Sequence, residues 1–237
     1  DYTEFPISLD QDDVDDDYTV TGWFNSDDIC QTDQGIIGQD NGGFDFFIEA
    51  SRDTCGELMF AVGSDVQVIS GGTLKSNQWY FIGAKLQGDK VYYSLNGNSW
   101  KDSGGSRSNY DASHESITSV GSISYDNGGE TFDGEIDEVR IYNRSLQDHE
   151  VHEVYRHGTF GRDMRQLTRD RGMVGYWSLD ENSGQTVYDL SGHGNDGKTS
   201  GNVTQGVNGL LGTSGYEFDG INDRVKTAEP TEGDIFD

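Results

Sequence analysis

The chain has 237 residues, of which 11% are aromatic, so it can bury the core of one large β-sandwich or of two small domains. Its 33 glycines, 2 prolines and many polar turn clusters favour short strands joined by loops and leave almost no room for long helices. The formal net charge of −27 would repel nucleic acid, and no run of about 18 apolar residues occurs, which excludes insertion into a membrane.

The first half of the chain predicts a series of short strands. Residues 18–24, "YTVTGWF", alternate so that Tyr18 and Val20 share one face while Trp23 lies on the other, which is a β pattern. Further strands are expected at 35–39, 44–50, 57–62, 66–69, 79–97 (as two strands that turn at Gly88-Asp89), 117–124 and 133–143.

A change of pattern follows the strand at 133–143. Leu146, Val151 and Val154 are spaced for one short amphipathic helix near 146–156, which Gly158 should end. Residues 159–171 carry four of the ten arginines, and we interpret them as an Arg-rich linker, either solvated or clamped against an acidic neighbouring module. The remaining strands are expected at 173–179, 186–190, 215–219 and 223–227.

Cys30 and Cys55 are the two cysteines of the chain, and each lies just outside a strand-like run. Adjacent hairpin ends would bring them together, so the sequence predicts a disulfide and an extracellular location, with two buried free thiols as the alternative. Their spacing fits no zinc pattern, because the five histidines are all distant.

Two groups of stretches carry a family resemblance, one from the end of the chain and one from its first two thirds. "GMVGYWSLDENSGQTVYDLSGHGNDGK" with "GYEFDGINDRV", and "YTVTGWFN" with "FDGEIDEVRIYNRSLQDHEV", resemble the laminin-G-like modules of the concanavalin A-like lectin/glucanase superfamily. The resemblance implies an all-β, concanavalin A-like jelly-roll sandwich of two antiparallel sheets. The family order is permuted, because residues 1–158 resemble the middle and C-terminal part of such a module, and residues 172–237 its N-terminal part.

The permuted order leaves three arrangements open. Residues 172–237 can complete the sandwich with 1–158 of their own chain, with a neighbouring repeat of a tandem array, or with another copy by strand donation. Asp1–Asp17 and Asp223–Asp237 resemble the same family segment, and this duplication favours a window on an array with a period of about 222 residues. In each case an incomplete sheet must be closed, because its edge would otherwise leave backbone groups unpaired.

The resemblance also implies a structural Ca²⁺ between the first and last strands of the module. Hard carboxylate and carbonyl oxygens suit Ca²⁺ better than softer metals. The implied ligands are Asp137, Glu138, Asp189 and Asp196 through their carboxylates, with carbonyls near His193 and Asn195. The alternative is that these carboxylates only lie in turns of an acidic surface.

The stretch "GEIDEVR" can be compared with the active-site strand of an enzyme, because laminarinase-type hydrolases of this superfamily carry a Glu-x-Asp-x-(x)-Glu motif. Glu135 and Asp137 match its start, but Val139 and Arg140 occupy the positions of the second Glu. A retaining glycosidase requires two carboxyl groups, and neither a GxSxG nor an HExxH motif is present. The sequence therefore predicts that the chain is not an enzyme.

Surface contacts are the remaining candidates for function. Trp100 and Tyr110 lie in loops outside any alternating run, and we interpret them as carbohydrate-binding residues, with packing on the sandwich edge as the alternative. Asn143 ("NRS") and Asn202 ("NVT") begin N-glycosylation sequons.

Together these features predict a non-enzymatic, extracellular, structural or adhesive module of a repeating cell-surface or filament protein. Its partners would be copies of itself, joined by sheet completion, and cell-surface glycans. The alternative is a calcium-dependent carbohydrate-binding module of an adhesin or of a secreted hydrolase. The acidic balance predicts a halophilic source, because salt must screen the repulsion among the excess carboxylates.

Overall fold

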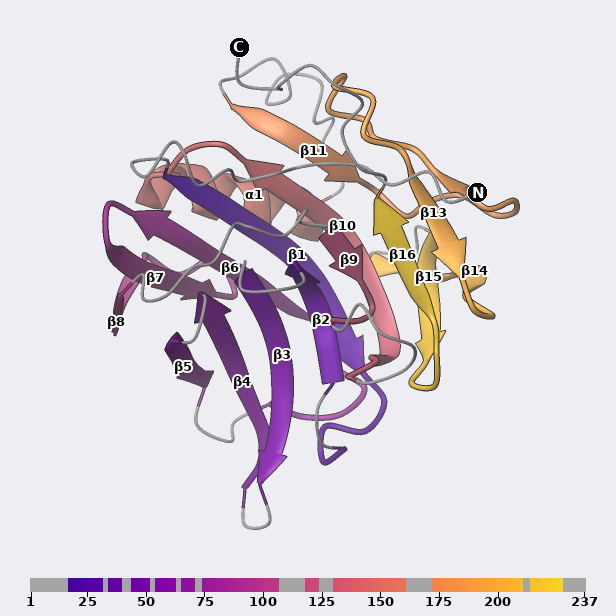
Figure 1. Ribbon diagram of the computed structural model, residues 1–237, viewed down its shortest axis with the longest axis horizontal. Helices are drawn as coiled ribbons and strands as arrows, with labels where there is room; N and C mark the ends of the chain where they lie inside the picture. The colour runs from indigo at the N-terminus through magenta and orange to yellow at the C-terminus, as the bar shows by residue number, and fades with distance from the viewer. Residues whose placement is uncertain are drawn as a thin grey trace.

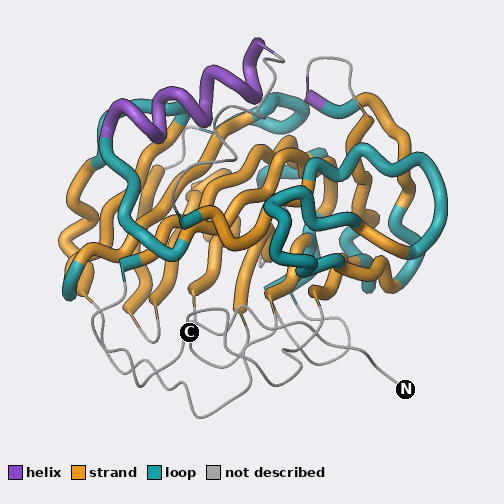
Figure 2. Tube along the Cα trace, turned by 90° about the horizontal axis from the view of Figure 1, so that it is seen from above, coloured by secondary structure: helices purple, strands orange, loops and turns teal. Residues whose placement is uncertain are grey.

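The computed structural model describes residues 17–31, 34–39, 44–51, 54–62, 65–70, 74–106, 118–123, 130–160, 172–210 and 214–227. In these segments two antiparallel sheets pack face to face, and one helix lies on the outside of one of them (Figures 1 and 2). The predicted all-β sandwich is therefore confirmed. No helix of the described segments is long and apolar enough to cross a membrane.

The first sheet, here called sheet I, contains eight of the described strands. Seven follow one path, and the eighth, β11 (Met173–Trp177), pairs with β10 beside β15. The order along the path is β14 (Thr204–Asn208), β15 (Ser214–Asp219), β10 (Asp133–Tyr142), β1 (Tyr18–Ser26), β6 (Tyr80–Gln87), β7 (Lys90–Leu95) and β8 (Lys101–Ser106). The β6–β7 hairpin turns at Gly88-Asp89, as the sequence predicts.

The second sheet, sheet II, contains the other eight described strands. Their order is β12 (Thr186–Val187), β13 (Gly197–Ser200), β16 (Arg224–Thr227), β9 (Thr118–Val120), β2 (Gln34–Gln39), β3 (Phe44–Ser51), β4 (Thr54–Val62) and β5 (Asp65–Ser70).

The last third of the chain completes the sandwich of the first two thirds. In sheet I, β10 pairs with both β11 and β15, and in sheet II, β16 pairs with β9. Figure 1 shows the orange and yellow strands of this last third beside β10 and β9. The two pieces of this one chain can therefore form a single closed sandwich, while assembly between copies stays a prediction.

The core between the sheets follows from the alternation of side chains along each strand. On β10, Ile136, Val139 and Ile141 all face this core and are fully buried, although their spacing is not strictly two. An irregularity makes this possible: Glu138 has a positive φ of 57°, and the pairing of β1 with β10 shifts register opposite it. Asp137, Arg140 and Tyr142 consequently face the outside of sheet I.

The outer face of sheet I is also buried, because helix α1 (Asp148–Phe160) covers it (Figure 2). Trp23 of β1 stacks on Tyr155 of the helix with ring centroids 5.3 Å apart. Two polar side chains fix the segment that enters the helix. Thr19 Oγ1 accepts a hydrogen bond from Leu146 N at 3.0 Å, and Lys85 Nζ donates to Leu146 O at 2.9 Å.

The helix bounds differ from the prediction. The helix begins at Asp148 rather than near 146, and it continues through Gly158 to Phe160, into the first two residues of the expected linker. Gly158 does not end the helix but packs against the sheet, where a Cβ would overlap the indole nitrogen of Trp23. Residues 161–171, with the four arginines, lie outside the described residues, as do 1–16 and 228–237.

The expected strands are present, with three differences. The prediction missed β8, β13 and β14, whose sequences "KDSGGS", "GKTS" and "TQGVN" have few strand-favouring residues. The strand expected at 117–124 is the short β9, after which Ser122 bridges to Thr131. The strand expected at 186–190 ends at Val187, where the chain leaves the sheet for a loop.

Candidate functional site

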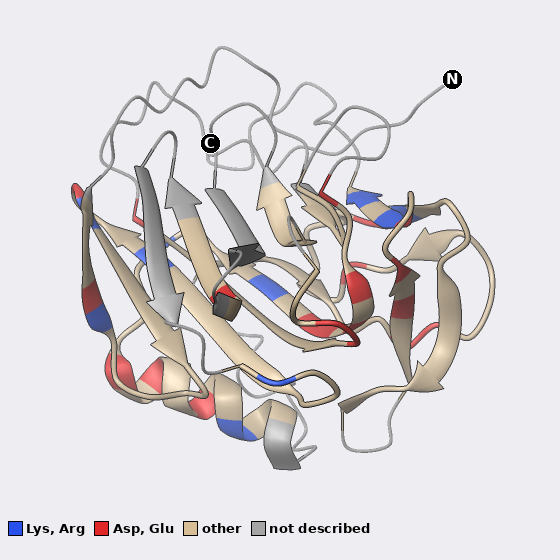
Figure 3. Cartoon of the chain, turned by 90° about the horizontal axis from the view of Figure 1, so that it is seen from below, with Lys and Arg blue, Asp and Glu red and all other residues tan. Residues whose placement is uncertain are grey.

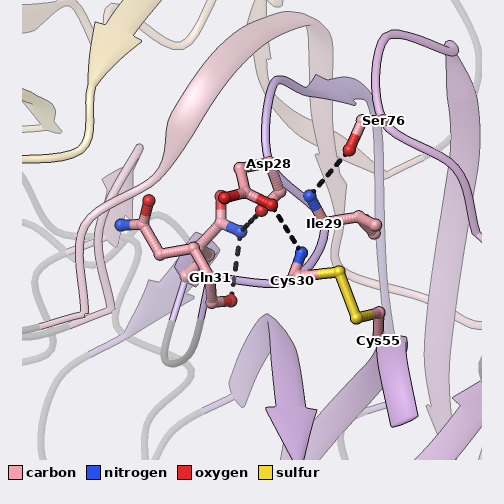
Figure 4. Close-up of a disulfide and its surroundings, with 7 residues drawn as sticks. Asp28, Ile29, Cys30, Gln31, Cys55 and Ser76 are labelled. Carbon is pink, nitrogen blue, oxygen red and sulfur yellow. Dashed lines mark hydrogen bonds between the residues drawn. A yellow bond between two sulfur atoms is a disulfide. The ribbon is translucent and has the colours of Figure 1, made fainter.

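The two cysteines form the predicted disulfide. Cys30 lies in the turn after β1 and Cys55 lies on β4 (Figure 4). The bond therefore ties a turn that follows a strand of sheet I to a strand of sheet II. Asp28 Oδ1 accepts a hydrogen bond from Cys30 N at 3.0 Å, and Ile29 N donates to Ser76 Oγ at 3.0 Å, which orders the turn. The bond closes a separation of 25 residues, for which chain entropy gives about 3 kcal/mol of stabilisation.

Asp137, an expected calcium ligand, is buried on the outer face of sheet I with a side chain 1% exposed. Its Oδ2 accepts a hydrogen bond from Leu210 N at 2.9 Å, and its Oδ1 has no hydrogen-bond partner among the described residues. Burial, followed by the nearby charge of Glu138, raises the pKa of Asp137 to about 8. This carboxyl group anchors the 209–210 backbone onto the sheet.

Glu138, a second expected ligand, is engaged by an ion pair. It contacts the guanidinium of Arg140, which is fully buried and lies 4.4 Å from the ring centroid of Tyr176. The hydroxyl of Tyr176 also donates to Glu138 Oε2 at 3.2 Å. The three side chains therefore form one closed cluster in which the charge of Arg140 is compensated by Glu138.

Asp189, the third expected ligand, orders the loop between β12 and β13. Its carboxylate accepts four hydrogen bonds, each between 2.7 and 2.9 Å long. The donors to Oδ1 are Tyr176 N and Ser191 N, and the donors to Oδ2 are Ser191 Oγ and Asn195 N. A carboxylate has about four lone-pair positions, so these protein donors fill its acceptor capacity.

The remaining expected ligands belong to the same loop. Asp196 Oδ1 accepts a hydrogen bond from Asp189 N at 2.9 Å, so the structure brings these two residues together. The backbone carbonyl of Asn195 accepts a hydrogen bond from the indole N–H of Trp177 at 2.8 Å, while the side-chain amide of Asn195 donates to Val174 O at 2.6 Å. His193 is exposed.

These contacts leave little room for the expected calcium ion. Most of the oxygens that the sequence assigns to the ion already accept hydrogen bonds from protein N–H and O–H groups: both carboxylate oxygens of Asp189 and of Glu138, Asp137 Oδ2, Asp196 Oδ1 and the Asn195 carbonyl. Throughout the described segments, no group of three or more His, Cys, Asp or Glu residues is placed to hold a metal. Calcium binding stays a prediction of the sequence, whereas the contacts of these residues predict that chelation leaves the fold unchanged.

Trp100, an expected sugar-binding residue, is half-buried between the sheet and the start of the helix. Its ring lies on Gly83 and has the ammonium of Lys85 4.9 Å from its centroid. Its backbone N–H donates to Asp148 Oδ1 at 3.0 Å. These contacts agree with packing of Trp100 on the sandwich edge, which was the alternative to sugar binding. Tyr110 lies outside the described residues.

The two sequon asparagines differ in exposure. Asn202 is exposed in the turn between β13 and β14, whereas Asn143 is half-buried directly after β10 and its N–H donates to Gly172 O at 2.7 Å. Of the two, Asn202 is placed for attachment of a glycan.

Sequence reasoning missed Tyr188 and Leu190, which flank Asp189. Their exposed fractions are 55% and 52%, and the other large apolar side chain exposed in the described segments is Ile221, at 67%. Tyr188 is thus the aromatic residue that the described surface exposes most. The signal was present in "TVYDL", where alternation puts Tyr188 and Leu190 on the face opposite Val187.

The fold is a two-sheet antiparallel sandwich with one helix over the outer face of sheet I. Comparison with known families agrees: residues 1–152 match the family model described as the concanavalin A-like lectin/glucanases superfamily. The chain belongs to this superfamily. No curated protein has a sequence significantly similar to this one.

Among solved structures, the chain is similar to a "putative carbohydrate binding protein" from Bacteroides ovatus, with a TM-score of 0.60 and 19% identity over 95% of this chain. The match covers 56% of that protein, so the chain spans just over half of its length. Similarity also extends to domain 4 of AbnA, a GH43 extracellular arabinanase from Geobacillus stearothermophilus in complex with arabinotriose. That match has a TM-score of 0.44, 19% identity and coverage of 58% of this chain and 66% of that chain.

Proposed function

We propose that this chain is a non-catalytic carbohydrate-binding module that works outside the cell. The observation that carries the proposal is that β10 lacks the second Glu of the Glu-x-Asp-x-(x)-Glu motif of hydrolases in the lectin/glucanase superfamily. Asp137 is buried against Leu210, and the positions for a second carboxylate hold Val139, in the core, and Arg140, paired with Glu138. The hydrolase motif is therefore incomplete on β10, although the strand also carries the half-buried Asp133, Glu135 and Glu138, and this favours binding over retaining hydrolysis.

The similarity to the Bacteroides ovatus protein supports this proposal, because it extends over 95% of the chain. That protein is described as a carbohydrate-binding protein. We extend the proposal to the larger protein that would carry this module. The module would attach an adhesin or a secreted hydrolase to a polysaccharide.

The proposed extracellular location is supported by the disulfide, since such bonds persist in oxidising compartments. The net charge of −27 supports a salt-rich environment. Assembly of copies by sheet completion would require β11, β15 and β16 to leave the strands of their own chain with which they pair. Size-exclusion chromatography in high salt tests that assembly: a dimer or filament would support it, and a 26.1 kDa monomer at all concentrations would exclude it.

Glycan binding is tested by affinity electrophoresis and calorimetry with a panel of polysaccharides in molar NaCl. We expect retarded migration in at least one polysaccharide, saturable binding of its oligosaccharides, and no release of reducing ends. Absence of binding across neutral and acidic glycans would contradict the proposed function. Release of reducing ends would contradict the non-catalytic part of it.

A further inference from the structure

We propose that Tyr188 and Leu190 form the sugar-contacting surface of this module, and that its ligand is a neutral pyranose chain. This inference rests on the proposed carbohydrate-binding function and assigns it a site. The surface is here called the 188/190 surface. It lies where the chain leaves β12, at the edge of sheet II.

The first argument is that both side chains are directed outward while their neighbours are buried or bonded. Val187 is fully buried in the core, and the Asp189 carboxylate points into the loop, where it accepts hydrogen bonds from Tyr176 N and Asn195 N. Tyr188 and Leu190 are each about half exposed. Two apolar side chains two positions apart thus face the solvent together.

The second argument is that the backbone under these side chains is fixed. Three successive N–H groups are bonded: Tyr188 N to Glu181 Oε1 at 2.8 Å, Asp189 N to Asp196 Oδ1 at 2.9 Å, and Leu190 N to Tyr176 O at 2.7 Å. Glu181 is itself held, because its Oε2 accepts from the buried Tyr216 hydroxyl at 2.8 Å. A surface that is already ordered loses little conformational entropy when it binds a ligand.

The third argument is chemical. A tyrosine ring can cover the C–H face of a pyranose while polar groups around it bond the sugar hydroxyls. The two loops that flank β12 expose Asn182 and Gln185 before the strand and His193 after it, and these side chains can donate and accept such bonds. A flat aromatic contact with neutral polar side chains in the adjoining loops suits a sugar better than a purely apolar ligand.

The charge of the loop selects a neutral ligand. Between residues 180 and 198 there are four carboxylates and one lysine, in a chain whose net charge is −27. Acidic sugars such as uronic acids or sulfated units would be repelled by this field. Trp100, by contrast, has Lys85 over its ring and its backbone bonded to Asp148, so less of its ring is available.

The test measures dissociation constants for neutral oligosaccharides of three to six pyranose units, by calorimetry on the whole chain in 0.1 M NaCl, where charges still act over about 10 Å. We expect Tyr188→Ala to weaken binding by about tenfold or more, as for an aromatic anchor, and Leu190→Ala to weaken it less. Tyr188→Trp should keep binding and report it through a fluorescence change. Ile221→Ala is the matched control, since it removes an equally exposed side chain from the β15–β16 turn and should leave affinity unchanged.

Thermal melting separates binding from folding, because the three side chains replaced in these four variants are exposed and the melting temperatures should stay within about 2 °C of each other. If the wild type binds and Tyr188→Ala binds equally well, the 188/190 surface is overturned while the proposed function stands. A loss in Trp100→Ala would then move the site to Trp100. Preference for uronic acid or sulfated oligosaccharides would overturn the ligand class, and absence of any glycan binding would overturn both proposals.

Discussion

At the scale of single residues, Asp189 performs with hydrogen bonds the role that a bound ion often has in ordering a loop. Its carboxylate accepts from donors on β11, on its own loop and near β13. Because protein groups fill these acceptor positions, we expect removal of calcium to leave the folded state unchanged. A melting curve with EDTA at fixed ionic strength should coincide with one in millimolar CaCl₂.

Replacing Asp189 by Ala gives the companion measurement. The variant leaves buried backbone donors of Tyr176 and Asn195 without their partner, so it should lower the free energy of unfolding by about 2 kcal/mol or more, with or without calcium. A melting temperature that falls with EDTA in the wild type but not in the variant would instead identify Asp189 as a calcium ligand.

Glu150 predicts a pH dependence. It accepts two hydrogen bonds from the Arg144 guanidinium, at 2.7 and 2.9 Å, and one from Gln147 N at the helix start, at 2.7 Å. The Arg144 guanidinium holds the pKa of Glu150 below its ordinary value of 4.5. Since the folded pKa is depressed, the stabilisation is present above pH 4.5 and is lost as the pH falls through the folded pKa.

We therefore expect Glu150→Gln to lower the free energy of unfolding at pH 7 by about 0.5–1 kcal/mol, a modest value because the ion pair is partly exposed. Urea unfolding should show the difference from wild type shrinking below pH 4.5. Glu153→Gln, on the exposed side of the same helix, is the control. A difference that stays constant from pH 7 to pH 3 would contradict the assignment.

Residue-level outcomes show which part of a site a sequence can give. The two cysteines and their pairing could be predicted, because hairpin ends and spacing are local features. The exposure of an aromatic residue in a loop could not be predicted, because it depends on residues far away in the sequence. Trp100 is covered by Lys85 and bonded to Asp148, which lie 15 and 48 positions away, whereas no distant segment buries Tyr188, which is 55% exposed.

At the scale of elements, the packing of α1 on sheet I depends on Gly158, which the sequence pattern predicts to end the helix. Gly158→Ala should stabilise an isolated helix by about 1 kcal/mol through propensity. In this protein the new Cβ would overlap the Trp23 indole, which cannot retreat because it stacks on Tyr155. We therefore expect a net loss of about 1–3 kcal/mol in urea unfolding.

The control for this prediction is Glu153→Ala, which also introduces alanine into α1 but on its exposed face. It should change the free energy of unfolding by less than about 0.5 kcal/mol. A stabilised Gly158→Ala variant would mean that the helix can lift from the sheet without cost, contrary to the packing of Trp23 and Leu210 against it.

Element positions could largely be predicted where strand-favouring residues form a run between turn residues. β1, β6 and β7 are rich in aromatic and aliphatic residues, and they lie where expected. β8 could not be found by the same rule, since "KDSGGS" forms a strand only through its pairing with β7. Tertiary pairing thus overrides local propensity at the sheet edge.

At the scale of the whole molecule, the sequence defines two complementary pieces but not how they join. Each piece needs the other, because a sheet edge leaves N–H and C=O groups unpaired. That need is equal for closure within the chain and between chains. Within this chain the two pieces are joined by pairings such as Ile136 with Tyr216 and Val120 with Val225, which join residues about 80 to 105 positions apart and which no local pattern encodes.

The excess of acidic charge governs the stability of the whole sandwich. Figure 3 shows acidic residues on the helix, on the strands and in turns, in a chain whose net charge is −27. The screening length falls from about 10 Å at 0.1 M salt to about 3 Å at 1 M, so repulsion among these carboxylates should weaken strongly over that interval.

We therefore expect the melting temperature to rise by about 5 °C or more between 0.1 and 1 M NaCl, which for a chain of this size corresponds to about 2 kcal/mol at the midpoint. KCl should act equally at the same concentration, because screening depends on ionic strength and not on the cation. A larger effect of Na₂SO₄ than of NaCl at equal ionic strength would measure the separate contribution of salt exclusion from apolar surface. A melting temperature that is flat or falling over this range would mean that the acidic side chains are spaced widely enough for water alone to screen them, and the expectation of a halophilic source would lose its physical basis.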